Sequence, residues 1–129
     1  MDRAWWVQYG AEAIAKFQGE RIAPQTYPGA RREKFSSVRN SGAGAVVLAA
    51  HWGARRIVLL GYDCQKTGGR AHWHPDHPRG MGNAGAVDKW PAQFSDARRH
   101  IGNTEVINCS RETALTVFPR ADLESVLCP

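Results

Sequence analysis

The stretch Ile57-Val58-Leu59-Leu60-Gly61-Tyr62-Asp63 decides the fold class of this 129-residue chain. A continuous run of β-branched residues and leucine, bounded by turn residues, is typical of a strand buried in a parallel sheet. Immediately upstream, Asn40-Ser41-Gly42 offers capping side chains, residues 43–52 are small and apolar, and Gly53 is a natural stop, which together predict a helix. A helix that leads into a buried strand is half of a βαβ unit, so the sequence predicts a small α/β fold.

The rest of the chain supplies further elements around this unit. We predict helices over residues 3–17, 90–101 and 122–127, and strands over 20–23 and 105–109. Residues 25–37 and 64–88 are rich in turn-forming residues and are predicted to be loops. No internal repeat or second domain is evident, so residues 1–129 are predicted to form one domain.

Composition narrows the functional classes. Hydrophobic residues make up 43% of the chain, an ordinary globular value, and the formal net charge is +5. A basic balance favours anionic partners such as nucleotides, but the basic loop at 25–37 has no aromatic platform around it, so nucleic acid is not favoured. Three cysteines without a C-x-x-C spacing predict neither a disulfide framework nor a structural zinc site. With no apolar run long enough for a signal peptide or a membrane span, we expect a cytoplasmic protein without a membrane partner.

The ends of the predicted strands carry polar side chains. In an open parallel sheet, ligands bind beyond the carboxyl ends of the strands. The free N–H groups of the predicted helix start would also suit a phosphate or carboxylate. Ordinary helix capping and turn capping are the structural alternatives. The predicted ligand-binding residues are Asn40, Ser41, Gly42, Asp63, Asn108 and Ser110.

The run His72-Trp73-His74-Pro75-Asp76-His77 is the sharpest local feature. Its titratable side chains could bind a divalent metal, act as a general base or contact phosphate, and His72, His74, Asp76 and His77 are therefore the candidate catalytic residues. The alternative is a structured loop whose histidines bond the backbone. Asp76-His77 also matches the Asp-His pair of HNH nucleases, but no helix follows to complete such a site.

These segments resemble a family of bacteriophage and prophage proteins of uncharacterised function. The resemblance rests on Asn40-Ser41-Gly42, the Ile57–Asp63 stretch, the histidine run, Trp90 and Phe94, and Val106-Ile107-Asn108-Cys109-Ser110 with Phe118-Pro119. More distantly, the Ser-Gly helix start and the Gly-x-Asp strand end are similar to sialyltransferase-like and archaeal pterin-diphosphokinase-like proteins. This likeness implies a small Rossmann-like, three-layer domain with a mostly parallel sheet flanked by helices. It also implies that Ser41 and Gly42 lie near a phosphate or sugar, Asp63 near the ribose or base, and a loop histidine near the reacting group.

One departure from the family affects the expected function. Longer members carry Asp-x-x-Trp-Trp in mid-chain, whereas here Asp2-Arg3-Ala4-Trp5-Trp6 stands at the start. We therefore expect an open sheet edge that a partner or a second copy covers, as in a homo-oligomer, or a loss of the original catalysis. The leading hypothesis is a phage-derived protein that binds a nucleotide or nucleotide sugar, with glycosyltransferase-like transfer as the reaction. The alternatives are a non-enzymatic phage accessory protein that binds a macromolecule, and a metal-dependent hydrolase or nuclease that uses the His72–His77 loop.

Overall fold

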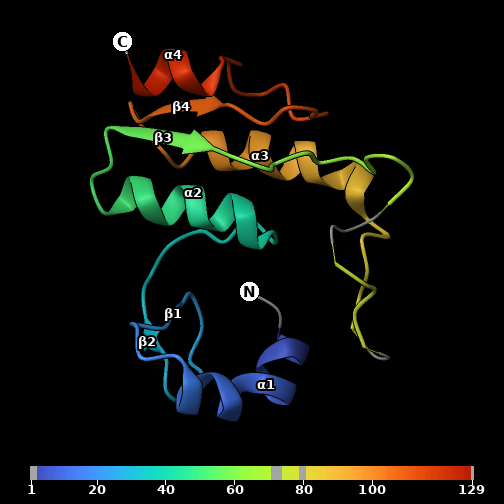
Figure 1. The fold of residues 1–129 in the computed structure, drawn as a ribbon. Helices are drawn as coiled ribbons and strands as arrows, with labels where there is room; N and C mark the ends of the chain where they lie inside the picture. Colours follow the sequence, from blue (N-terminus) through green and yellow to red (C-terminus); the bar gives the residue numbers. More distant parts are fainter. Residues whose placement is uncertain (1–2, 71–73, 79–80, 129) are drawn as a thin grey trace.

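The chain is a small α/β fold built from helices and two small parallel sheets. The computed structural model describes residues 3–70, 74–78 and 81–128. Its elements, in chain order, are α1 (Arg3–Lys16), β1 (Ile22–Ala23), β2 (Arg31–Arg32), α2 (Ser41–His51), β3 (Arg56–Leu59), the 3-10 turn η1 (Val87–Lys89), α3 (Trp90–Arg98), β4 (Glu105–Asn108) and α4 (Leu123–Leu127). Figure 1 shows α2, α3, β3, β4 and α4 together in the upper part, and α1 with β1 and β2 below them.

The β3–β4 pair confirms the predicted parallel arrangement. Ile57 lies opposite Val106 and Leu59 opposite Asn108, and α3 lies in the connection between the two strands. This is a complete βαβ unit. The strand is shorter than predicted, because Leu59 is its last residue and Gly61 takes a positive φ of 70° that turns the chain. Val58 and Ile107, on the opposite face of the strands, are half-buried rather than buried.

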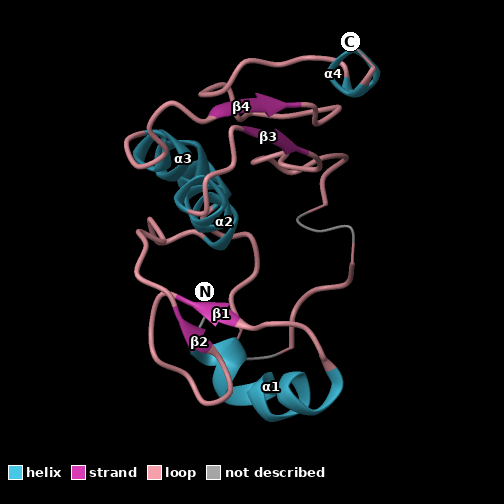
Figure 2. Ribbon diagram, turned by 90° about the vertical axis from the view of Figure 1, so that its left-hand side faces the viewer, coloured by secondary structure: helices cyan, strands magenta, loops and turns pink. Residues whose placement is uncertain are grey.

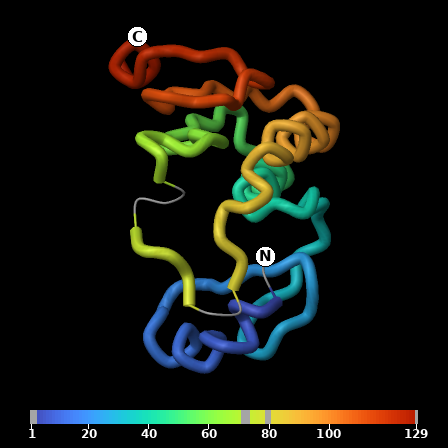
Figure 3. Tube along the Cα trace, turned by 90° about the vertical axis from the view of Figure 1, so that its right-hand side faces the viewer, coloured from blue at the N-terminus to red at the C-terminus, as the bar shows by residue number. Residues whose placement is uncertain are grey.

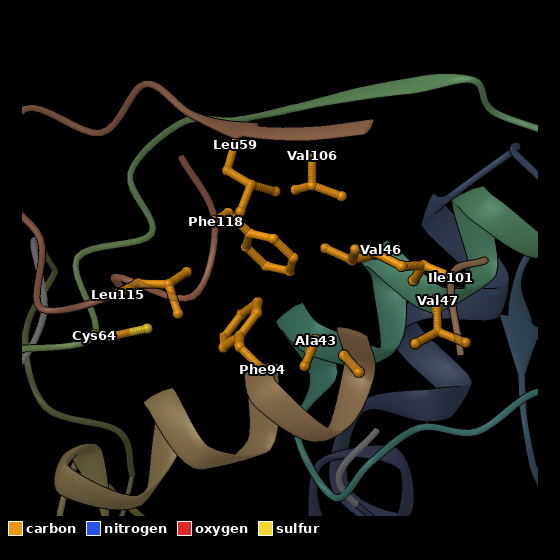
Figure 4. Close-up of a cluster of buried hydrophobic side chains, with 11 residues drawn as sticks. Ala43, Val46, Val47, Leu59, Cys64, Phe94, Ile101, Val106, Leu115 and Phe118 are labelled. Carbon is orange, nitrogen blue, oxygen red and sulfur yellow. The ribbon is translucent and has the colours of Figure 1, made fainter. Parts of the chain in front are cut away.

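The main core lies between this sheet and two helices. α2 and α3 lie on one side of the β3–β4 pair and the short α4 on the other (Figures 1 and 2). Figure 4 shows side chains from α2, α3, both strands and the 115–118 segment pointing toward one another. Phe94, Leu59, Leu115 and Val46 are the largest fully buried apolar side chains. Full burial of a side chain of this kind contributes about 1.5–3 kcal/mol, so these residues hold the two layers together.

The N-terminal part has a small packing cluster of its own. Trp6 of α1 is buried against Tyr27, with ring centroids 5.4 Å apart. The predicted helix is confirmed, but the 25–37 loop contains the short strand β2, which pairs in parallel with β1. Phe35 packs against the main core and so links the two parts. The segment 74–78 runs down from the upper part toward this lower part (Figure 3). No helix among the described residues has the length and apolar character needed to cross a membrane.

Candidate ligand-binding clefts

The start of α2 is built as predicted. Asn40 is its N-cap, and the Asn40 side chain accepts a hydrogen bond from the Ala43 N–H at 3.0 Å. The Asn40 Nδ2 group donates to Gln93 Oε1 of α3 at 3.0 Å, which fixes the cap against the neighbouring helix. Within the described residues, the N–H groups of Ser41 and Gly42 have no hydrogen-bond acceptor. Because the helix dipole adds positive potential there, the two groups form an anion-accepting end.

A cleft of about 740 Å³ opens at this helix start, and we call it the first cleft. It brings together predicted residues from three separate segments: the helix cap, the end of the β3 stretch and the histidine run. It also has three aromatic walls and one arginine that the sequence reasoning did not assign to a site. Its lining is Gln25, Ser37, Arg39, Asn40, Ser41, Gly42, Gly61, Tyr62, Asp63, Cys64, His77, Trp90 and Phe94.

The backbone around the first cleft is strained. Among the described residues, only Val38, Arg39 and Cys64 combine a side chain with a positive φ, at 44°, 58° and 51°. Arg39 and Cys64 line the cleft, and Val38 is the neighbour of Arg39. Such conformations cost about 1–3 kcal/mol each and cluster at functional sites. The strain is therefore concentrated on two walls of this cleft.

Gly42 is required by a close approach of Tyr62. A Cβ atom at position 42 would lie 2.9 Å from Tyr62 Cε1 and 3.5 Å from Phe94 Cζ. The Tyr62 ring is held edge-on to Phe94, with centroids 5.6 Å apart and planes at 85°. Burial raises the pKa of Tyr62, and the neighbouring Cys64 raises it further, so the phenol is neutral near pH 7. The ring is an uncharged wall next to the α2 start.

Asp63 stands between the first cleft and another, which we call the second cleft. Asp63 and Gly61 line both of them. The Thr67 hydroxyl donates to Asp63 Oδ2 at 3.3 Å. The second cleft is about 920 Å³ and is lined by Leu60, Gly61, Asp63, Thr67, Cys109, Ser110, Arg111, Glu112, Arg120, Ala121, Asp122, Leu123 and Glu124.

Asn108 and Ser110 hold the strand ends together. Asn108 is fully buried, lines neither cleft, and donates through Nδ2 to Leu115 O at 3.2 Å and to Thr113 Oγ1 at 3.3 Å. Its Oδ1 accepts from the Ser110 N–H at 3.0 Å. The Ser110 hydroxyl oxygen accepts from the Tyr62 N–H at 2.8 Å, and the Thr113 hydroxyl donates to Tyr62 O at 2.7 Å. The structure therefore places Asn108 in a buried network behind the clefts, and only Ser110 of this pair on a cleft wall.

Of the described residues in the histidine run, only His77 lines the first cleft. The His77 backbone N–H donates to Asn83 Oδ1 at 2.9 Å. His74 lies with its ring centroid 5.0 Å from that of His77, and its Nδ1 is 2.6 Å from Pro75 O. Asp76 is exposed, and neither it nor His74 lines the two clefts. His72 and Trp73 lie outside the described residues. Across the part that is described, no group of three or more His, Cys, Asp or Glu side chains could hold a metal ion.

Cys64 is a buried thiol on the wall of the first cleft. Burial, and secondarily the charge of Asp63, raise its pKa to about 11. A thiol with so high a pKa stays protonated near neutral pH and is a poor nucleophile. Arg39, Tyr62, Trp90 and Phe94 are lining residues that the sequence did not assign to a site. For Arg39 the available signal was its place directly before the helix cap.

Comparisons of the chain with protein-family models, with curated proteins and with solved structures gave no match.

Proposed function

We propose that the first cleft binds a nucleotide or nucleotide sugar, and that the chain acts as a glycosyltransferase-like protein. The observation that carries this proposal is the meeting of an anion-accepting helix start, an arginine and a carboxylate in one cleft with aromatic walls. None of these features alone specifies a nucleotide, but together they match one: the helix start and the arginine suit its phosphate, the carboxylate its sugar, and the aromatic walls its base.

The phosphate would lie against the start of α2. The Ser41 and Gly42 N–H groups donate to phosphate oxygens, and the Arg39 guanidinium adds a charge-assisted hydrogen bond. A hydrogen bond to a charged group contributes about 1.5–3 kcal/mol, and the dipole of a helix about 0.3–1 kcal/mol. The formal net charge of +5 adds a general attraction for anions.

The sugar and the base would occupy the rest of the first cleft. The Asp63 carboxylate accepts hydrogen bonds from sugar hydroxyl groups. Tyr62 and Trp90 are half-buried, so each can present ring surface on which a base stacks. Stacking of a base on an aromatic side chain contributes about 1–3 kcal/mol. In this arrangement His77 lies near the reacting group.

The proposal includes a Rossmann-like architecture. It is supported by the β3–α3–β4 unit, by the parallel pairing and by a cleft near the carboxyl end of β3. Origin in a phage or prophage, a cytoplasmic location in the bacterial host and assembly with a second copy belong to the same proposal, and they rest on the sequence expectations.

Isothermal titration of the full chain tests the proposal. The probes are uridine, cytidine, guanosine and adenosine diphosphates and nucleotide sugars of each base, with and without Mg²⁺. We expect at least one to bind, and Arg39→Gln to weaken it about tenfold, the loss expected for about 1.4 kcal/mol. Arg32→Gln is the matched control, because Arg32 is exposed on β2 and lines neither cleft. Absence of binding by every probe would refute the proposal.

A further inference from the structure

We propose that the second cleft is the acceptor site and takes a neutral, polyhydroxylated molecule such as a saccharide or polyol, with Asp63 as the group that removes the acceptor's proton. This inference rests on the proposed function, because it assigns the nucleotide donor to the first cleft.

The charges of the second cleft differ from those of the first. Four carboxylates and two guanidinium groups line it, which leaves a formal charge of −2. An acidic lining disfavours a second phosphate and suits hydroxyl groups, which donate hydrogen bonds to carboxylates. The acceptor is therefore expected to carry hydroxyl groups rather than an anion.

Several lining groups already have structural partners. Arg120 Nη2 donates to Ser110 O at 3.1 Å and to Arg111 O at 2.9 Å, which fixes one wall. Asp122 caps α4 by accepting from the Glu124 N–H at 3.0 Å. Glu112 is exposed and, within the described residues, its carboxylate has no ion-pair or hydrogen-bond partner. The Glu124 carboxylate is likewise exposed and, among the described residues, has no ion-pair or hydrogen-bond partner, so Glu112 and Glu124 are the two carboxylates best placed to bind acceptor hydroxyls.

Among the described residues, Asp63 is the titratable one that lines both clefts. Tyr62, Cys64 and His77 line the first cleft only, and Glu112 the second only. The Thr67 hydroxyl donates to Asp63 Oδ2 and orients the carboxylate, while no described group bonds Oδ1. A base for transfer must lie within hydrogen-bond reach of the acceptor hydroxyl and close to the donor's reacting carbon. A carboxylate shared by two adjoining clefts meets that requirement.

The reaction balances as a simple displacement. The acceptor hydroxyl oxygen forms a bond to the anomeric carbon of the donor sugar, and its proton moves to the Asp63 carboxylate. The bond between that carbon and the phosphate oxygen breaks, and the departing nucleotide keeps the electron pair. The extra negative charge on its phosphate forms next to the Ser41 and Gly42 N–H groups and Arg39, where it is stabilised.

The test compares binding with transfer in the full chain. UDP-glucose, GDP-mannose and CMP-sialic acid serve as donors, and lactose, maltose and glycerol as acceptors. Nucleotide release and product mass are the readouts for transfer, and titration calorimetry is the readout for donor binding. We expect Asp63→Asn to weaken donor binding by no more than about tenfold, because the amide loses the carboxylate's charge but keeps an oxygen that accepts from the donor's sugar hydroxyls, and to lower transfer at least about 100-fold.

A second variant keeps the test independent of Asp63. We expect Glu112→Gln to raise the KM for the acceptor about tenfold with donor affinity unchanged. Asp88→Asn, on exposed η1 and outside both clefts, is the matched control and should change nothing. If the donors bind but no acceptor is glycosylated, or if Asp63→Asn transfers like the parent chain, the acceptor assignment is wrong. If no donor binds, the proposed function itself fails.

Discussion

Replacing Asn108 with alanine tests whether this residue holds the site together or contacts a ligand. The Asn108 side chain is fully buried and forms three hydrogen bonds, to Leu115 O, Thr113 Oγ1 and the Ser110 N–H. Thr113 keeps its bonds to Tyr62 O and the Leu115 N–H in the variant. Two buried backbone groups, Ser110 N–H and Leu115 C=O, would lose the Asn108 partner.

Each such group costs about 1–3 kcal/mol when it is left unsatisfied, so we expect the free energy of unfolding to fall by about 3 kcal/mol. For a domain of this size that corresponds to a fall in Tm of about 10 °C. Urea unfolding followed by tryptophan fluorescence measures it, and the m-value should stay constant.

The matched control for this variant is Asn103→Ala. Asn103 is exposed in the turn before β4, and its replacement should change stability by less than about 0.5 kcal/mol. If Asn108→Ala lowers the free energy of unfolding by less than about 1 kcal/mol, the structural role is refuted. Weaker nucleotide binding in the same variant would then indicate that Asn108 contacts the ligand.

Two further predictions concern the first cleft. Gly42→Ala places a methyl group 2.9 Å from Tyr62 Cε1, so the ring must shift, and nucleotide affinity should fall about tenfold in calorimetry. Gly82→Ala, where a Cβ meets open space, should leave it unchanged, and equal affinity in both variants would contradict the packing argument. The pKa of the Cys64 thiol is raised from 9.0 to about 11, so the folded chain binds that proton more tightly than the unfolded chain and loses stability as pH rises from 9 toward 11. In urea unfolding between pH 9 and 11, Cys64→Ala should lose less stability than the parent chain. Thiol labelling at pH 8 should modify the exposed Cys128 well before Cys64. Equally fast labelling of both thiols would show that Cys64 is not buried.

The regular elements of the main core were predictable because their signals are local. The cap at Asn40, the small apolar run after it and the β-branched strand each act over a few residues, and α2, β3 and β4 were found where the patterns indicate them. The break at Gly61 was harder, since Leu60 and Tyr62 continue the apolar pattern on both sides. The strand ends at Leu59, and the chain turns at Gly61, whose φ is positive.

The segments that form the site were predictable from the sequence, but which of their residues line a cleft was not. Asn40 caps a helix, Asp63 follows the end of β3 and His77 lies in the 64–88 loop, and the first cleft brings the three together although no strand leads directly into α2. The burial of Asn108 was not predictable, because it depends on the 113–115 turn folding back over the strand end. Arg39 was missed as well, since the positive φ of 58° that places it beside the cleft is uncommon for arginine and is not indicated by its residue type.

The central claim, that the start of α2 accepts the phosphate of a nucleotide, is tested most directly by amide NMR. A nucleoside diphosphate that binds in calorimetry is titrated into ¹⁵N-labelled chain, and the Ser41 and Gly42 signals are followed. The account predicts that these two signals shift with the calorimetric affinity and move downfield, as amides do when they donate to a phosphate. Gly53 and Gly102, where a Cβ would meet open space, serve as internal references and should not move. Saturable nucleotide binding with unchanged Ser41 and Gly42 signals would contradict the account.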